Sequence, residues 1–223
     1  MNSLGYGGLS GETVFSMAVH DVTTNYVQDL RSLGSAPRST DELISMSIHN
    51  VTVNYIRELQ TLGVAELTAD HLVSMRIHDV EPEFVRVLRN MNYNPSVDDL
   101  VSLRIHGATS NYIKQMRDLG FRPTLEQIVS MRIHGVEPEF VRELKSMNYS
   151  PNADDLVSLR IHGATSEFIK QVRSLGFSPT LEQVVSMRIH GVTPDYIRKV
   201  QSHGVKNLTI DQLVSLRIHG IVE

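Results

Sequence analysis

Apolar residues recur along the chain with the spacing of an α-helix, in two patterns that alternate. In the first, an arc of about 120° on a helical wheel contains Phe140, Val141, Leu144 and Met147, and Arg142 and Lys145 lie opposite. In the second, the apolar positions spread over about 200°, as in Leu181, Val184, Val185, Met187 and Ile189. The first pattern predicts a helix with one solvated face, and the second an inner helix that contacts several neighbours.

Capping residues indicate where both kinds of helix begin. Thr193 followed by Pro194 predicts the start of a first helix, called an A helix, which ends near His203. A good N-cap for the second kind, called a B helix, recurs at Ser10, Ser39, Thr68, Ser96, Thr124, Asn152, Thr180 and Thr209. Complete capping boxes are expected for Thr124 with Gln127, Thr180 with Gln183, Thr209 with Gln212 and Ser39 with Glu42.

Residues that tolerate a left-handed backbone indicate where the helices end. The A helices are followed by Gly34, Gly63, Asn92, Gly120, Asn148, Gly176 and Gly204. The B helices are followed by Asp21, Asn50, Asp79, Gly107, Gly135, Gly163, Gly191 and Gly220. These boundaries predict eight B helices, seven A helices, no strand and a helix content above about 60%.

A histidine closes every B helix and reveals an internal repeat. The eight positions are His20, His49, His78, His106, His134, His162, His190 and His219, so successive copies are 28 or 29 residues apart. A sustained period of this length is typical of stacked helix pairs that bury their apolar faces against one another. We therefore predict an all-α solenoid of eight helix-pair repeats that forms a single array over residues 1–223. By analogy with other helix-pair solenoids, we expect a right-handed superhelix.

Composition excludes or disfavours several classes of function. The 223 residues include no cysteine, which excludes disulfides, thiolate metal sites and cysteine nucleophiles and leaves the compartment open. A net charge of -4 disfavours a dedicated nucleic-acid binder. The chain lacks the 18 to 20 consecutive apolar residues, roughly, of a membrane span, so membrane insertion is not expected.

Residues 185–198, which read Val-Ser-Met-Arg-Ile-His-Gly-Val-Thr-Pro-Asp-Tyr-Ile-Arg, resemble an uncharacterised bacterial helical repeat. Such repeats follow the membrane part of some antirepressor-like, β-lactam-sensor-type metallopeptidases. The resemblance implies the repeat fold, and either a free-standing array or a piece of a longer chain. It implies no peptidase activity, because the His-Glu-x-x-His zinc motif is absent here.

The repeated polar residues favour structure over chemistry. Repeat histidines on successive helices should lie roughly 8 to 10 Å apart, too far to share a zinc ion, so no metal or cofactor is predicted. A serine precedes each histidine by four residues, at Ser16, Ser45, Ser74, Ser102, Ser130, Ser158, Ser186 and Ser215. A Ser–His hydrogen bond is feasible at this spacing, but eight equal copies provide no single pocket, so we predict no enzyme and interpret serine as a small packing residue.

An arginine recurs two residues before the histidine in six copies, at Arg76, Arg104, Arg132, Arg160, Arg188 and Arg217, whereas Ala18 and Ser47 stand there in the first two. Because this position lies inside the apolar arc, the stem should cross the core and the guanidinium should reach carboxylates or helix carbonyls. We predict a structural ladder rather than a ligand site.

Two positions on the solvated side of the A helices are basic, and we call them together the basic band. They are Arg57, Arg86, Lys114, Arg142, Lys170 and Arg198 in the first register, and Arg31, Arg89, Arg117, Lys145 and Arg173 in the second. We predict that Arg86, Arg89, Lys114, Arg117, Arg142, Lys145, Lys170 and Arg173 bind an acidic protein partner. Two alternatives are a solvated face whose charges pair locally and a surface for anionic ligands such as nucleic acid or lipid headgroups. Nucleic acid is less favoured, because Phe84, Tyr112, Phe140 and Phe168 are expected in the core.

The array begins and ends on B helices, whose broad apolar arcs lack a further repeat. The last copy keeps Leu213, Val214, Leu216 and Ile218 where a polar cap would be expected. We therefore expect end-to-end association into a homo-oligomer.

Overall fold

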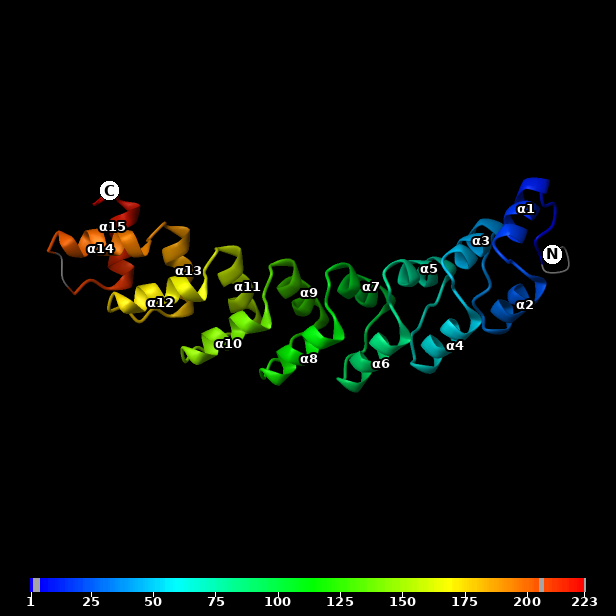
Figure 1. Cartoon of the computed structure of the whole chain (residues 1–223), viewed down its shortest axis with the longest axis horizontal. Coiled ribbons are helices and arrows are strands. Elements are labelled where there is room, and N and C mark those ends of the chain that lie inside the picture. The colour runs from blue at the N-terminus through cyan, green and yellow to red at the C-terminus, as the bar shows by residue number, and fades with distance from the viewer. Residues whose placement is uncertain (2–4, 205–206, 223) are drawn as a thin grey trace. The chain divides into compact units, whose positions relative to one another are not determined.

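The computed structural model describes residues 1, 5–204 and 207–222, and all regular secondary structure in these ranges is helical (Figure 1). The B helices are α1 (Gly11–Val19), α3 (Thr40–Ile48), α5 (Ala69–Ile77), α7 (Val97–Ile105), α9 (Leu125–Ile133), α11 (Ala153–Ile161), α13 (Leu181–Ile189) and α15 (Ile210–Ile218). The A helices are α2 (Thr24–Ser32), α4 (Val53–Thr61), α6 (Pro82–Asn90), α8 (Ser110–Asp118), α10 (Pro138–Ser146), α12 (Ser166–Ser174) and α14 (Pro194–Ser202). Each has nine residues, so 135 of the 223 residues are helical, and no strand occurs in the described ranges. The predicted all-α solenoid is confirmed.

The chain divides into two compact units, residues 1–110 and 111–223. In the first unit α1, α3, α5 and α7 pack in one row, and α2, α4 and α6 in a second. In the second unit α9, α11, α13 and α15 form one row, and α10, α12 and α14 the other. Helices of nine residues are too short to persist alone in water, so this packing supplies their stability. A single array over residues 1–223 and a right-handed superhelix stay predictions.

The predicted N-caps of all eight B helices are confirmed, since each cap side chain accepts a hydrogen bond from the backbone N–H three residues later. Three predicted capping boxes form, at Thr124, Thr180 and Thr209. The box predicted at Ser39 is wrong, because the Glu42 carboxylate accepts from the backbone N–H of Arg38 instead, at 2.7 Å. Two further boxes form at Ser96 and Asn152, where Asp99 and Asp155 take the place of Glu or Gln.

The predicted helix ends are also confirmed. All fifteen closing residues have a positive φ, for example 53° at Asp79 and 64° at Asn92. The B helices close with a Schellman hydrogen bond, such as that from the Val80 N–H to the Met75 carbonyl at 2.8 Å. The apolar residue in this bond packs inward, and Val80 and Val136 are fully buried.

The core lies between the two rows of each unit and is aliphatic. The solvated face predicted for the A helices is confirmed: Phe140, Val141 and Leu144 are buried, and Arg142 and Lys145 are exposed. The prediction that the whole apolar arc of a B helix is internal is wrong. Val184 and Met187 are buried, but Ile189 is 54% exposed, because the outer side of each B row has no second layer of helices over it.

Candidate binding faces

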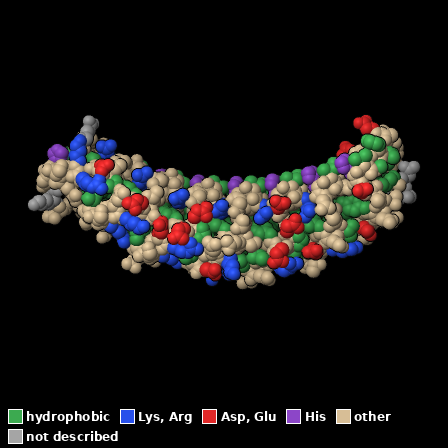
Figure 2. Space-filling view, in the orientation of Figure 1, with side chains coloured by type: hydrophobic (Ala, Val, Ile, Leu, Met, Phe, Trp, Pro, Cys, Tyr) green, Lys and Arg blue, Asp and Glu red, His purple; other side chains and the backbone are tan. Residues whose placement is uncertain are grey.

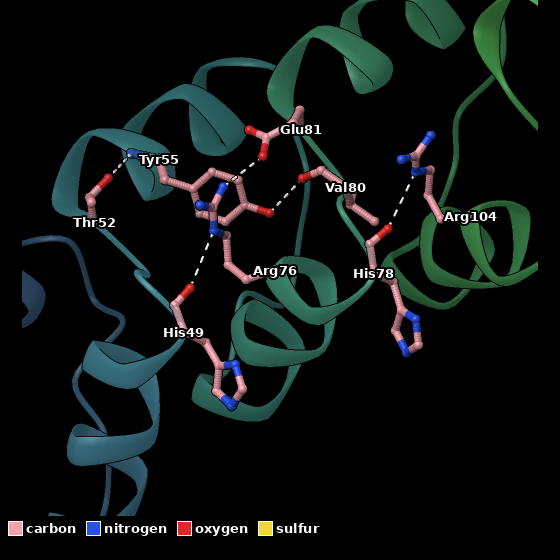
Figure 3. Close-up of polar contacts among 8 residues, drawn as sticks. All are labelled: His49, Thr52, Tyr55, Arg76, His78, Val80, Glu81 and Arg104. Atoms are coloured by element: carbon pink, nitrogen blue, oxygen red, sulfur yellow. Dashed lines mark hydrogen bonds and ion pairs between the residues drawn. The ribbon is translucent and has the colours of Figure 1, made fainter.

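The arginine ladder ties each repeat to the one before it, as Figure 3 shows for Arg76. The Arg76 guanidinium lies 4.9 Å from the centre of the Tyr55 ring, its Nε donates to the His49 carbonyl at 3.4 Å, and Nη1 pairs with Glu81 at 2.8 Å. Tyr55 in turn donates its hydroxyl to the Val80 carbonyl at 2.7 Å. Arg104, Arg132, Arg160, Arg188 and Arg217 stack in the same way on Phe84, Tyr112, Phe140, Phe168 and Tyr196. The ladder is structural, as predicted, and its guanidinium groups cover one face of each of these aromatic rings.

The aromatic rings that carry a ladder arginine are more buried than the one ring at this position that lacks it. Tyr55, with Arg76 above it, is only 5% exposed and its pKa is raised by that burial. Tyr26 occupies the corresponding position one repeat earlier, where Ser47 replaces the arginine, and it is half-buried. Ser47 Oγ donates to the His20 carbonyl, the acceptor that Arg Nε uses elsewhere.

The repeat histidines contribute their backbone to the fold. Each caps its B helix, and the carbonyls of His49, His78 and His162 accept a hydrogen bond from the arginine of the next copy. Among the repeat histidines of the described ranges, the imidazole of His219 alone contacts a carbonyl of its own helix, with Nδ1 2.8 Å from the Ser215 carbonyl. In the described part of the chain no serine hydroxyl bonds its repeat histidine, and no group of three possible metal ligands occurs. In Figure 2 the histidines of each unit lie along the edge formed by the B helices of that unit.

The basic band has two registers with different surroundings. Second-register side chains reach back to the preceding A helix: Arg89 Nη2 donates to the Gly63 carbonyl at 3.0 Å, and Lys145 donates to that of Leu119. In the first register, Arg86, Arg142 and Arg198 pair with the acidic residue three positions earlier, at Glu83, Glu139 and Asp195. Lys170 lies 3.9 Å from Glu143, while Lys114 is exposed with no ion pair among the described residues. Much of the band is locally neutralised, and its role in binding stays a prediction.

A row of exposed aliphatic residues follows the outer side of the B helices. It occupies the position before each repeat histidine, and we call it the isoleucine row: Val19, Ile48, Ile77, Ile105, Ile133, Ile161, Ile189 and Ile218. The exposed fraction is 52 to 57% in every copy. Toward the start of each helix the row is extended by Phe15, which is 71% exposed, and by the partly exposed Ile44, Val73, Val101, Val129, Val157 and Val185, whereas Val214 at this position of the last copy is buried.

A second row, seven residues before the isoleucine row, is acidic in all eight copies. We call it the acidic row: Glu12, Asp41, Asp70, Asp98, Glu126, Asp154, Glu182 and Asp211. All eight side chains are exposed, and none forms an ion pair within the described ranges. Asp154 and Asp211 accept hydrogen bonds from Gln127 and Gln183 of the preceding B helix. Sequence reasoning missed both rows, although the 28-residue alignment contains them, because it placed the isoleucine in the apolar arc of an inner helix and did not compare the acidic positions between copies.

The apolar surface predicted at the C-terminal copy is only partly exposed. Leu213 is fully buried and Val214 is 8% exposed, because α15 packs against α13 with that side. Ile218 is exposed, but it belongs to the isoleucine row found in every copy. End-to-end association stays a prediction, and only part of the apolar surface on which it rested is free.

No family model, no curated protein and no solved structure matches this chain. Within the described residues, none of the helices is long and apolar enough to cross a membrane.

Proposed function

We propose that this chain is a non-enzymatic protein-interaction scaffold that binds its partner along a repeated surface. One observation carries the proposal. Every exposed large hydrophobic side chain in the described ranges lies in a B helix, apart from Ile221 just after α15. Apolar side chains that stay in water add no stability to the fold, and contiguous exposed apolar residues are typical of interaction sites.

The B face, meaning the isoleucine row, the acidic row and the residues between them, supports this function better than the basic band does. The band places its charges beside carboxylates and carbonyls of its own chain, so a partner would have to compete for them. The isoleucines half-exposed on the B helices have no such competitor. Their repetition also provides several weak contacts of one kind, which together give affinity for an elongated partner.

Selection from a random-peptide display library on the full chain tests this proposal without assuming the partner's chemistry. We expect enrichment of peptides that bind the wild-type chain and lose affinity for the triple variant Ile133→Ala, Ile161→Ala and Ile189→Ala. Alanine keeps the helices, since it is the best helix former. Failure to enrich any peptide that binds the chain would contradict the proposed scaffold function.

Charge reversal at Arg86, Lys114, Arg142 and Lys170, each to Glu, tests the basic band as the alternative surface. This variant should retain the selected peptides if the B face binds them. Loss of the peptides here, with full binding by the alanine variant, would move the site to the basic band and restore an acidic partner or an anionic ligand such as nucleic acid or lipid headgroups.

A further inference from the structure

The B face combines apolar and acidic side chains on one stripe of each helix. Within a B helix, the acidic residue, the Val position, the serine and the isoleucine are spaced i, i+3, i+4 and i+7, as in Glu126, Val129, Ser130 and Ile133. This spacing places all four on one side of the helix, with the carboxylate about two turns from the isoleucine. None of these four registers contains a lysine or arginine in any copy. The outer side of each row is therefore both apolar and negatively charged.

Helix capping does not account for the acidic row. The first turn of a helix favours carboxylates in the A and B helices alike. Yet an acidic residue occurs in the first turn of all eight B helices and of only four of the seven A helices. Three of those four, Glu83, Glu139 and Asp195, pair with an arginine of their own helix, whereas the acidic row is left without ion pairs in the described residues. The carboxylates of the acidic row therefore lie without ion pairs on the side of the helix where the isoleucine row is exposed.

From this combination we propose that the B face binds a basic amphipathic α-helix of another protein, laid along the row of B helices in a unit. This inference rests on the proposed scaffold function and specifies its partner. Aliphatic side chains of the partner cover the isoleucine row, and its lysines and arginines lie over the acidic row. The charge complementarity excludes an acidic partner at this face.

The spacing of the rows favours a helical partner over an extended one. Packed helices lie roughly 8 to 10 Å apart, so neighbouring isoleucines of the row have about that separation. Residues i and i+7 of an α-helix are about 10.5 Å apart on one side, which matches this step. Same-face residues of a strand recur at about 6.8 Å and fall out of register after one step. Four B helices span about 30 Å, the length of a helix of about 20 residues.

Three synthetic peptides of equal length test the proposal against the full chain. The first has leucine at i, i+3, i+4 and i+7 with flanking lysine and arginine, the second replaces the basic residues by glutamate, and the third replaces leucine by serine. Binding is followed by fluorescence anisotropy of labelled peptide at low and high salt. We expect the first peptide to bind at least about tenfold more tightly than either of the others.

Matched variants locate the site. The acidic-row variant is Glu126→Gln, Asp154→Asn and Glu182→Gln, and its control is Glu139→Gln, Glu167→Gln and Asp195→Asn. Both sets lie at the second position of their helices in the same unit and change the net charge equally. We expect the acidic-row variant to weaken binding about tenfold and to reduce its salt dependence, while the control changes affinity less than about twofold. The isoleucine-row variant Ile133→Ala, Ile161→Ala and Ile189→Ala should weaken binding and keep the salt dependence.

Several results would overturn the proposal. Equal weakening by the control would show that only net charge matters, and tighter binding of the glutamate peptide would reverse the assigned partner. Binding of the chain to phosphatidylcholine vesicles through the isoleucine row, without binding of the basic peptide, would assign the face to a lipid surface. If display selection yields B-face ligands that are not basic, the scaffold function stands and this partner is wrong.

Discussion

The missing rung of the arginine ladder predicts that Ser47→Arg stabilises the first unit. Position 47 lies at the ladder register, above a Tyr26 ring that is half-buried, whereas Tyr55 under Arg76 is 5% exposed. An arginine here fits the stacking on an aromatic ring seen in six other copies. Its guanidinium should stack on Tyr26, and its Nε should donate to the His20 carbonyl, which Ser47 Oγ now occupies.

The size of the effect follows from opposing contributions. Stacking of a partly exposed guanidinium on an aromatic ring contributes about 0.5 to 1 kcal/mol. Covering Tyr26 and the arginine stem removes roughly 50 Å² or more of apolar surface from water, which at about 25 cal/mol per Å² adds about 1 kcal/mol. Ordering the arginine costs about 1 kcal/mol, less than for a fully buried side chain because the guanidinium stays partly exposed. The exchange of one hydrogen bond to His20 for another is close to neutral. The net gain in the free energy of unfolding is therefore about 0.5 to 1 kcal/mol.

Urea unfolding followed by circular dichroism measures this gain, and amide hydrogen exchange locates it in residues 1–110. Ser47→Met is the control, because methionine supplies an apolar stem without the guanidinium and should give less than half of the effect. An arginine variant no more stable than wild type, or one that only matches Ser47→Met, would refute the reasoning that the guanidinium and ring stabilise each other.

Three further predictions concern stability. Met131→Pro, inside α9, should raise hydrogen exchange in the adjoining repeat as well as in its own, because neighbouring helices are each other's core; exchange confined to α9 would contradict this. Thr124→Ala should cost about 1 kcal/mol, measured by urea unfolding, because it removes the side-chain half of a capping box, and an unchanged midpoint would count against the cap. Burial raises the pKa of Tyr26 to about 12 and also raises the pKa values of Tyr55 and Tyr112, so the unfolded chain loses these protons first and stability should fall as the pH rises from about 10 to 12. The triple variant Tyr26→Phe, Tyr55→Phe and Tyr112→Phe should flatten that decline, and an equally steep loss would rule out the tyrosines as its cause.

Local chemistry made the helix boundaries predictable. An N-cap side chain bonds a backbone N–H three residues later, and a left-handed closing residue depends on its own backbone conformation. Thr124 and Asn92 can therefore begin and end their helices whatever packs around them. The errors arose where more than one local hydrogen-bond arrangement was available to the same side chain. Glu42 had two backbone donors within reach and accepted from Arg38, and Asp99 closed a box although its side chain is shorter than that of Glu.

Sequence by itself determined the repeat, the fifteen helices and the structural use of the arginine ladder, because these depend on spacing along one chain. Only the tertiary structure decided which side of a B helix is covered. Met187 and Ile189 both fall in the apolar arc of a helical wheel, yet Met187 is buried and Ile189 is exposed. The reason is that the layer of A helices covers only one side of the row of B helices. The same packing decided that much of the basic band pairs with groups of its own chain, while the acidic row is left without ion pairs in the described residues. Exposure and charge pairing depend on what lies next to a side chain in space, and the sequence does not specify that until the repeats stack.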